Sequence, residues 1–351
     1  MSAVAGPDTV ARLAAWLGRL TDGVPDAGRL QLRVPTGGGW SNDTWIVQVA
    51  GAARPLAVVR LQPERRSMFP DYDLGRQAAV LHALEGAVGV PVPPLLGVDL
   101  DGAELGRPAF VMGFVEGRAP SDDRPSFVEA GWLHDAAAAQ QRRFHEDLLA
   151  HLAAVHTLEV AAIGLEWLAG PGPSSAPAAI DALRRVWDYD QGPVAAPIVQ
   201  QAFAEVAGTA PPVDPSPATL LWGDARPANV LCEPDGFAVV ALLDWELATH
   251  GPPEFDVAWM MEMNWMRAQG AGLAPLPGFL DDDAAVAHYE AVSGRVLGGL
   301  GWYRRFAALK VAVLMHRYLR AMVHAGDVPA THRILTDNVS TRRLDSLLGP
   351  G

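Results

Sequence analysis

Two residue types are nearly absent from this chain of 351 residues. It has one cysteine, Cys232, and one lysine, Lys310, so 26 of its 27 basic residues are arginine. A single cysteine excludes an intramolecular disulfide and any metal site built from several cysteines, and it agrees with a reducing cytoplasmic location. A lysine that does not follow glycine excludes a Walker A loop. Any phosphate would therefore be held by arginine, backbone N–H groups or a metal ion.

Long apolar runs and an excess of positive charge are also missing. Half of the residues are apolar, yet the best membrane candidate, FAALKVAVLM, is short and contains Lys310, so no transmembrane helix is predicted. The N-terminus lacks the features of a signal peptide and predicts an amphipathic helix beginning near Asp8. The net charge of −13 argues against nonspecific binding to nucleic acid or anionic membranes. It suits a cationic substrate, and it serves solubility equally well.

The chain has two regions with different patterns. Residues 30–62 and 91–116 contain β-branched and aromatic runs broken by glycine and proline, which predict a small antiparallel sheet. One helix is expected between them, at about 72–86, because apolar residues recur there at helical spacing. After residue 117 the pattern is mostly helical, with short strands at ATLLWGD, NVLCEP and AVVALLDW. The length allows two domains or one large two-lobed domain.

The segment LLWGDARPANVL contains the polar residues that best indicate chemistry. Asp224 and Asn229 flank Pro227 at the end of an expected strand. A tight turn joins the next two strands, so the hairpin returns Asp244 to a place beside them. Carboxylate and amide oxygens are ligands that suit Mg²⁺, and a carboxylate that is not a ligand can accept a hydroxyl proton. Each residue alone is common in turns, but the set in this order favours a catalytic site.

These motifs resemble the aminoglycoside phosphotransferase-like branch of the protein-kinase-like fold. The pattern D-x-x-x-x-N, followed by a hairpin and LDWE, is similar to that of antibiotic, choline and homoserine kinases. WGDARPANVL, ALLDWELATHGPPEFDVAW and GGGWSNDTWIV most resemble kinase domains associated with acyl-CoA dehydrogenases. The resemblance covers nearly the whole chain. It implies an α+β, two-lobed fold with a small antiparallel-sheet N-terminal lobe and a large, mostly helical C-terminal lobe.

The same resemblance implies a division of the chain. Residues 1–111 would form the nucleotide-binding lobe with a leading helix, residues 112–116 the hinge, and residues 117–351 the helical catalytic and substrate lobe. The segment FVMGFVEG would contain the hinge. Adenine would bond to backbone groups around Met112 and Phe114.

Roles follow residue by residue from the matching motifs. Asp224 corresponds to the catalytic base, and Asn229 and Asp244 correspond to the Mg²⁺ ligands. Asp256, in EFDVAW, matches a residue that braces the catalytic loop. Glu246 matches a carboxylate beside the metal site.

The segment TGGGWSND would cover the phosphates of ATP. Its backbone N–H groups would face them, because glycine permits a close approach, although the segment alone reads as an ordinary hairpin turn. Its candidate residues are Gly37, Gly38, Gly39, Ser41 and Asn42. Arg60 lies where relatives place a phosphate-binding lysine, and arginine can hold a phosphate bidentately. Gln77 replaces the usual glutamate partner; its amide is expected to hydrogen-bond Arg60 without the charge, and Glu64 and Glu85 are alternative partners.

Other polar residues have structural explanations. His145, His151 and His156 lie on one expected helix at spacings that do not form a metal-ligand pair, and His156 is expected to pack near the catalytic loop. The acidic run 281–283 is expected to start a helix, whose dipole favours acidic residues there, with cation binding as the alternative. The Ala/Pro/Gly-rich segment 169–179 is expected to be a loop.

The sequence predicts an enzyme that uses ATP and Mg²⁺ to phosphorylate a hydroxyl group of a small molecule. An aminoglycoside would suit the negative charge, and a hydroxyacyl-type acceptor would suit the sub-family resemblance. No nucleic-acid or membrane partner is expected, and the oligomeric state is open. Gln77 and Trp222 motivate the alternative of a nucleotide-binding pseudokinase or regulatory scaffold. Trp222 replaces a histidine of most relatives, and is expected to fill its space and donate one hydrogen bond.

Overall fold

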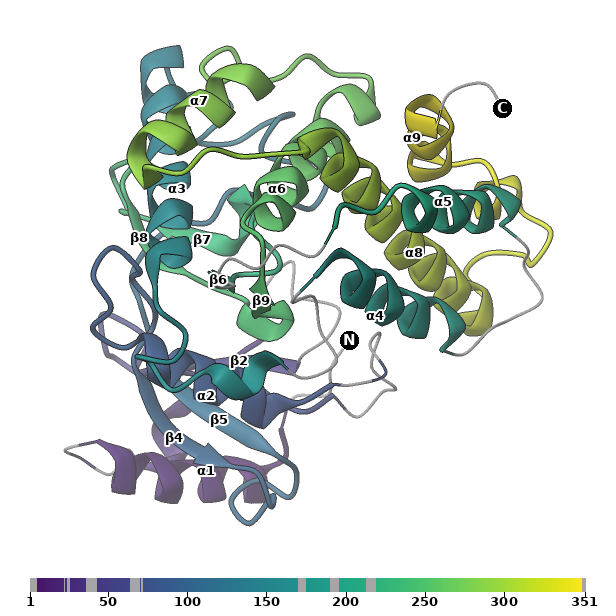
Figure 1. Cartoon of the computed structure of the whole chain (residues 1–351). Helices are drawn as coiled ribbons and strands as arrows, with labels where there is room; N and C mark the ends of the chain where they lie inside the picture. Colours follow the sequence, from purple (N-terminus) through teal and green to yellow (C-terminus); the bar gives the residue numbers. More distant parts are fainter. Residues whose placement is uncertain are drawn as a thin grey trace.

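The chain forms two lobes, as Figure 1 shows: a small N-terminal lobe built on a sheet and a larger helical lobe above it. The computed structural model describes residues 5–21, 23, 26–35, 43–63, 70, 72–169, 175–189, 196–212 and 219–348. The predicted α+β, two-lobed architecture is confirmed. Among the described helices, none has the length and apolarity needed to cross a membrane.

The N-terminal lobe contains a five-stranded antiparallel sheet in the order β1-β2-β3-β5-β4. The strands are β1 (Leu30–Arg33), β2 (Asp43–Val49), β3 (Ala57–Leu61), β4 (Leu95–Asp99) and β5 (Ala109–Gly113). In the central strand β3, buried residues alternate with half-buried ones, as expected when one face packs on a core. This sheet is the one that the sequence pattern predicts.

Two helices pack on this lobe. Helix α1 (Pro7–Leu20) is amphipathic, as predicted, and buries Leu13, Trp16 and Leu17 in a cluster with the sheet. Helix α2 (Leu74–Leu84) begins at the N-cap Asp73, whose side chain accepts a hydrogen bond from the backbone N–H of Arg76. This capping interaction starts the helix within the predicted range.

The C-terminal lobe is mostly helical. Its helices are α3 (Ala138–Thr157), α4 (Ala176–Asp188), α5 (Pro197–Gly208), α6 (Glu254–Arg267), α7 (Asp282–Ser293), α8 (Leu300–Ala325) and α9 (Val339–Leu348). Two small antiparallel pairs join β6 (Thr219–Leu221) to β9 (Thr249–Gly251) and β7 (Val230–Cys232) to β8 (Val239–Leu242). Short 3-10 turns are η1 (Ala27–Arg29), η2 (Glu166–Ala169), η3 (Pro227–Asn229), η4 (Trp245–Leu247), η5 (Gln269–Ala271) and η6 (Arg333–Leu335).

Most sequence expectations for this lobe hold. The hairpin of β7 and β8 is present, and Asp281 caps α7, as expected for an acidic helix start. The expectation of a loop over 169–179 is wrong at its end, because α4 begins at Ala176. Ser175 is the N-cap and a proline lies in the first turn, so residues that resemble a loop in fact start a helix. Strand β9 was not expected.

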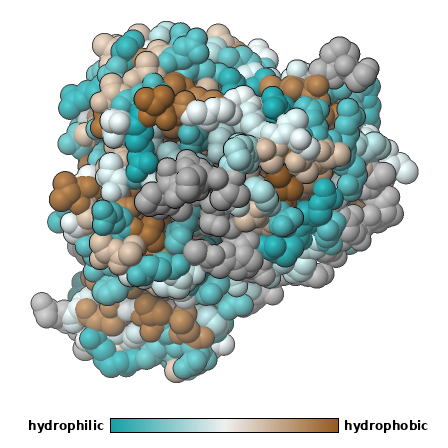
Figure 2. All heavy atoms as spheres, viewed as in Figure 1, coloured by the Kyte–Doolittle hydropathy of each residue, from teal (hydrophilic) through white to brown (hydrophobic). Residues whose placement is uncertain are grey.

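One hydrophobic cluster spans the two lobes, beside clusters that lie within a single lobe. Buried residues of α2 and β5, including Leu84 and Phe110, belong to the same cluster as Phe144 and Leu148 of α3. Backbone hydrogen bonds also cross between the lobes, such as the one from Leu242 N–H to the carbonyl of Pro91 at 2.8 Å. On the face seen in Figure 2, hydrophobic residues lie in separate patches among hydrophilic ones.

Candidate active site

The loop after β6 is held by a buried carboxylate. Asp256, at the start of α6, accepts hydrogen bonds from the backbone N–H groups of Trp222 at 2.6 Å and Gly223 at 2.9 Å. His156, fully buried on α3, lies 3.2 Å from the same carboxylate and 2.7 Å from the hydroxyl of Tyr289. The expected bracing role of Asp256 and the expected place of His156 are therefore confirmed.

Gly223 is required by the turn that follows. Its φ is +86°, and a Cβ atom there would lie 2.1 Å from the carbonyl oxygen of Leu247. Only glycine fits this conformation and this close backbone approach. The turn directs the next residue, Asp224, toward the junction between the lobes.

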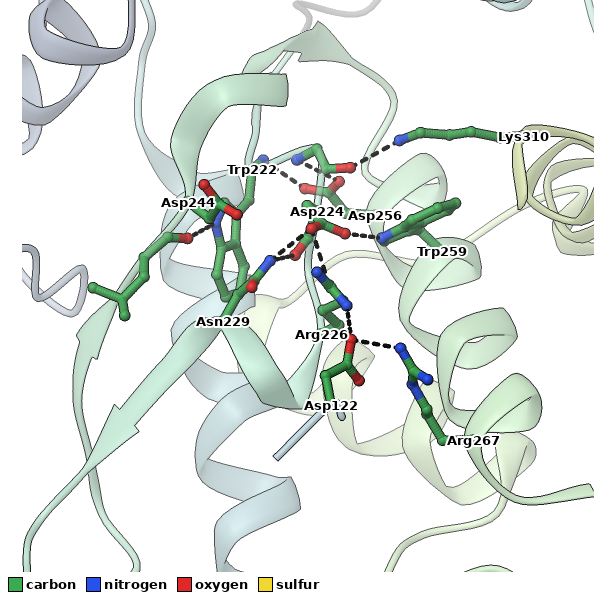
Figure 3. Close-up of polar contacts among 12 residues, drawn as sticks. Asp122, Trp222, Asp224, Arg226, Asn229, Asp244, Asp256, Trp259, Arg267 and Lys310 are labelled. Carbon is green, nitrogen blue, oxygen red and sulfur yellow. Dashed lines mark hydrogen bonds and ion pairs between the residues drawn. The ribbon is translucent and has the colours of Figure 1, made fainter. Parts of the chain in front are cut away.

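Asp224 lies at the centre of the polar cluster in Figure 3. Its Oδ1 accepts a hydrogen bond from the indole N–H of Trp259 at 2.8 Å. Its Oδ2 accepts from the amide of Asn229 at 2.7 Å and from Nε of Arg226 at 2.9 Å. Three side chains thus fix the orientation of one carboxylate.

These contacts also set the charge of Asp224. Burial raises the pKa of its carboxyl group, but Arg226, Lys310 and hydrogen bonds from Asn229 and Trp259 lower that pKa by more. The net pKa lies below the ordinary value, so the group is ionised at neutral pH. Such a carboxylate is a weak base and a strong hydrogen-bond acceptor.

The hairpin brings Asn229 and Asp244 to the same end of the site. The Leu243 N–H donates to the carbonyl of Asn229 at 2.8 Å, and Asp244 follows directly. Asp244 has φ +63° and is the one non-glycine residue with positive φ in the described part of the chain. A left-handed aspartate costs about 1 kcal/mol, which the turn from β8 into η4 must offset. Sequence reasoning placed these residues together but did not predict this conformation.

The side-chain oxygens of Asn229 and Asp244 are the candidate ligands for Mg²⁺. Asn229 uses its amide nitrogen to bond the backbone oxygen and Oδ2 of Asp224, which leaves its oxygen as the atom with which it would bind a cation. Asp244 supplies a carboxylate. The described residues contain no group of three or more His, Cys, Asp or Glu side chains able to hold a metal. Two protein oxygens nevertheless fit Mg²⁺, which keeps waters and shares its site with phosphates.

Only some of the residues expected to bind the nucleotide lie in the described part of the chain. Arg60, on β3, pairs with Asp244 at 3.1 Å. Gln77 is buried and hydrogen-bonds Tyr72, so its expected bond to Arg60 is not among those of the described residues. Glu85 instead accepts a hydrogen bond from the backbone of Leu95. The remaining glycine-segment candidates and one possible partner lie outside the described residues: Gly37, Gly38, Gly39, Ser41, Asn42 and Glu64.

The hinge candidates lie where the sheet ends. Met112 is buried in β5, opposite Val58 of β3, and Phe114 follows the strand and is half-buried. Three residues after Phe114, Gly117 precedes Arg118, whose backbone pairs with Cys232 of β7. This bridge ties the connecting segment to the catalytic hairpin. The binding roles of Met112 and Phe114 stay predictions.

Trp222 fills the space under the loop. It is fully buried, and its indole N–H donates to the carbonyl of Leu243 at 2.8 Å. Its ring lies 5.7 Å from the ring of Trp245, centroid to centroid. The expectation that Trp222 packs there and donates one hydrogen bond is confirmed. It links the loop that carries Asp224 to the residue before Asp244.

Sequence reasoning missed several partners of the catalytic cluster. Arg226 contacts Asp122 as well as Asp224, and Arg267 of α6 also pairs with Asp122, at 2.6 Å. Arg226 lies inside the motif of the loop and Trp259 ends the motif EFDVAW, so both had a local signal. Asp122 and Arg267 come from distant segments, and no local pattern marks them.

A cavity of about 260 Å³ lies beside the catalytic loop. It is bordered by α4, α6, α8 and the start of α2. Apolar residues form most of its wall, including Leu183, Val186, Leu221, Phe255, Trp259 and Phe306. Polar lining residues include Tyr72, Asp73, Arg76, Arg185, Glu246, Asp256 and Lys310. The cavity is therefore mainly apolar and has cationic groups in its wall.

The lobes, the braced loop and the cluster around Asp224 define a phosphotransferase with a kinase-like fold. The sequence profile of the phosphotransferase enzyme family (APH) matches residues 33–294, and the chain belongs to this family.

Two curated relatives are acyl-CoA dehydrogenases by description. A probable acyl-CoA dehydrogenase of Arabidopsis thaliana is 26% identical over 312 residues, which cover 83% of this chain and 37% of the relative. Acyl-CoA dehydrogenase family member 11 of Gallus gallus is 30% identical over 249 residues, covering 70% of this chain and 30% of the relative. The chain thus spans only about a third of the length of these relatives, in agreement with the sub-family resemblance of its motifs.

Solved structures show the same fold. A putative aminoglycoside phosphotransferase from Ralstonia eutropha superposes with a TM-score of 0.71 at 23% identity, covering 96% of this chain and 95% of that chain. An ethanolamine kinase from Plasmodium vivax gives a TM-score of 0.59 at 12% identity, covering 97% of this chain and 87% of that chain. The kinase-like fold predicted from the sequence is confirmed.

Proposed function

We propose that this chain transfers the γ-phosphoryl group of ATP, with Mg²⁺, to a hydroxyl group of a small acyl-containing molecule. The observation that carries the proposal is the fixed, ionised carboxylate of Asp224. It lies at the end of a hairpin that also presents Asn229 and Asp244. Residues 1–111, 112–116 and 117–351 would serve as the nucleotide lobe, hinge and catalytic lobe.

In this proposal Asp224 orients the acceptor. The lowered pKa of Asp224 makes its carboxylate a poor proton acceptor before transfer. A loose phosphoryl-transfer transition state requires little base strength. The hydroxyl group would donate a hydrogen bond to the carboxylate and point its oxygen at the γ-phosphorus. As the new O–P bond forms and the bond from the γ-phosphorus to the bridging oxygen of ADP breaks, the hydroxyl proton would pass to Asp224. Rate enhancement would then come mainly from positioning and charge neutralisation.

Asn229 and Asp244 would hold Mg²⁺, which supplies neutralisation of phosphate charge when bound. Arg60 already lies against Asp244, so its guanidinium is placed to meet the phosphates that share the metal site. The backbone of residues 37–42 would cover those phosphates, and backbone groups around Met112 and Phe114 would bind the adenine. Among solved relatives by fold, one aminoglycoside phosphotransferase is described in complex with ADP and another with GDP.

The cavity favours a hydroxyacyl-type acceptor over an aminoglycoside. An aminoglycoside carries several ammonium groups and calls for several carboxylates, yet two of the three in the wall, Asp73 and Asp256, already accept hydrogen bonds from backbone N–H groups. A mainly apolar wall with Lys310 and Arg185 suits an acyl chain with oxygen atoms. The relatives described as acyl-CoA dehydrogenases support the same choice.

Two variants test this proposal. Turnover is measured as ATP consumption with hydroxyacyl acceptors, and Mg-ATP affinity is measured separately. Asp224→Asn should lower turnover by roughly 10²–10⁴ while Mg-ATP binding survives, because it removes the group that would orient the hydroxyl and take its proton. Asp244→Ala should instead abolish Mg²⁺-dependent ATP affinity, measured by calorimetry. Near-normal turnover in Asp224→Asn would contradict the assignment. Binding of Mg-ATP by the unaltered protein without transfer to any acceptor would favour the pseudokinase alternative.

A further inference from the structure

Lys310, the one lysine of the chain, reaches from α8 to the catalytic loop. Its ammonium group donates to the carbonyl oxygen of Gly223 at 2.9 Å and lies 4.1 Å from the ring centroid of Trp259. Trp259 in turn donates to Asp224. The ammonium is thus one side chain away from the carboxylate that would orient the acceptor.

Burying the ammonium group of Lys310 costs free energy, and a purely structural hydrogen bond would not require that charge. Burial lowers the pKa of Lys310, although Asp224 and Asp256 act in the opposite direction. A single bond to a backbone carbonyl does not require a charged group, since any neutral donor could make it. An ammonium has three N–H donors, and Gly223 is its one hydrogen-bond acceptor among the described residues. The other two N–H donors of the ammonium group adjoin the cavity that Lys310 lines.

Lys310 also lies on the side of Asp224 opposite the nucleotide candidates. Figure 3 shows Asp244 on one side of Asp224 and Lys310 with Trp259 on the other. Arg60 pairs with Asp244 on the first side. The charge of Lys310 is therefore placed to meet the acceptor in the cavity and not the phosphates of the nucleotide.

We propose that Lys310 is the specificity residue for the acceptor, and that its ammonium group binds the carbonyl or carboxylate oxygen of the acyl group. With one end of the acceptor held there and its hydroxyl held at Asp224, the spacing between the two groups would select the substrate. Trp259 would supply the apolar surface between them, because its ring faces Lys310 and its N–H faces Asp224. This inference rests on the proposed hydroxyacyl acceptor.

The test compares acceptors with and without the acyl oxygen. Hydroxy acids that differ in the number of carbons between hydroxyl and carboxyl, and matched diols lacking the carboxyl group, are assayed with the unaltered protein and with Lys310→Met. Loss of one charged hydrogen bond should raise KM for the hydroxy acids by roughly 10- to 100-fold. The ratio of KM for the hydroxy acids to KM for the matched diols should therefore rise by the same factor, because an effect of the lost contact with Gly223 on both acceptors cancels in the ratio.

Two further variants sharpen the comparison. Lys310→Arg keeps the positive charge and should retain part of the preference for hydroxy acids over diols. Arg142→Met removes one positive charge from an exposed position of α3, where Arg142 pairs with Glu146, and controls for net charge. It should leave the preference unchanged.

The outcomes separate this inference from the function on which it rests. If the unaltered protein phosphorylates hydroxy acids and Lys310→Met lowers activity equally for all acceptors, Lys310 is a structural link and the inference is wrong. If the unaltered protein phosphorylates no hydroxyacyl compound, the proposed acceptor class is wrong and the role of Lys310 falls with it.

Discussion

Asp256 shows how one buried carboxylate can determine the shape of a loop. The turn at Trp222 and Gly223 would otherwise leave two backbone N–H groups buried without partners, at a cost of about 1–3 kcal/mol each. Asp256 accepts from both, and His156 and Tyr289 extend the network on its other side. The carboxylate therefore stabilises the conformation that presents Asp224.

His145 predicts a pH dependence of stability. Burial and the nearby His288 lower the pKa of His145 from 6.5 to about 4. As pH falls, the unfolded chain takes up the proton on His145 before the folded chain does. The contribution of the neutral His145 to the free energy of unfolding is therefore complete above about pH 6.5 and is lost toward pH 4. A difference of that size corresponds to roughly 3 kcal/mol. Urea unfolding at pH 7, 6 and 5 should show the decline.

The control for this prediction is His145→Gln, which can still accept the hydrogen bond from the N–H of Leu280. It should be less stable at pH 7, since the ring stacked on Phe279 is lost, and its stability should fall less steeply with pH. Part of the slope should remain, because burial also lowers the pKa of His316 to about 4. An unaltered slope would show that His145 does not contribute.

At the residue scale, the sequence predicted the motif residues of the site better than the residues that contact them from other helices. Asp224, Asn229 and Asp244 lie in a compact pattern, since a loop and a hairpin bring them together over a short stretch. Trp259 and Lys310 reach the cluster from α6 and α8. Their contacts depend on how these helices pack, and that packing has no signature at the level of spacing.

At the scale of elements, α6 is the support of the site. One part of it carries Asp256, Trp259 and Arg267 toward the catalytic loop and Asp122. Another part carries Glu262, which is fully buried and forms two hydrogen bonds with Arg343 of α9 at 2.7 and 3.0 Å. Helix α9 is thereby bonded to the helix that positions the carboxylate of Asp224.

This ion pair predicts a strong dependence of stability on Arg343. Arg343→Ala should cost roughly 3–5 kcal/mol in free energy of unfolding, because it leaves the buried Glu262 without its partner. The double variant with Glu262→Ala should cost clearly less than the sum of the two single variants. Urea unfolding of all four proteins measures the coupling. Arg142→Ala, which breaks an exposed pair, should cost less than about 1 kcal/mol.

A small effect of Arg343→Ala would contradict this prediction. A loss below about 1 kcal/mol would mean that Glu262 is solvated or protonated when alone, and that α9 is held mainly by apolar contacts.

At this scale, the sequence predicted the sheet and the long helices from periodicity. It did not predict β9 or the start of α4, because a three-residue strand and a proline-containing first turn have no period of their own.

At the scale of the whole molecule, the lobes are not independent folding units. The cluster that contains Leu84 of α2 also contains Leu148 of α3 and Val230 of β7. A kinase-like resemblance predicts two lobes but not whether their cores are separate. It also gives no account of the cavity, whose wall comes from α4, α6 and α8 together.

A shared core predicts one cooperative unfolding transition in calorimetry. Leu84→Ala and Leu148→Ala remove fully buried side chains from opposite lobes, and each should lower the stability of that one transition by roughly 2–5 kcal/mol. Val88→Ala, at a side chain that is 92% exposed, is the matched control and should have little effect. Two separable transitions, each sensitive to one core variant, would contradict the shared core.

The scarcity of lysine has a consequence for chemical labelling. Every side-chain amine reaction on this chain must occur at Lys310, and the lowered pKa of that amine makes its neutral, nucleophilic form more abundant than at an exposed lysine. An aldehyde or activated ester small enough for the cavity would therefore mark one side chain next to the catalytic loop. Occupancy of the acceptor cavity could then be followed as protection of a single position in a mass spectrum.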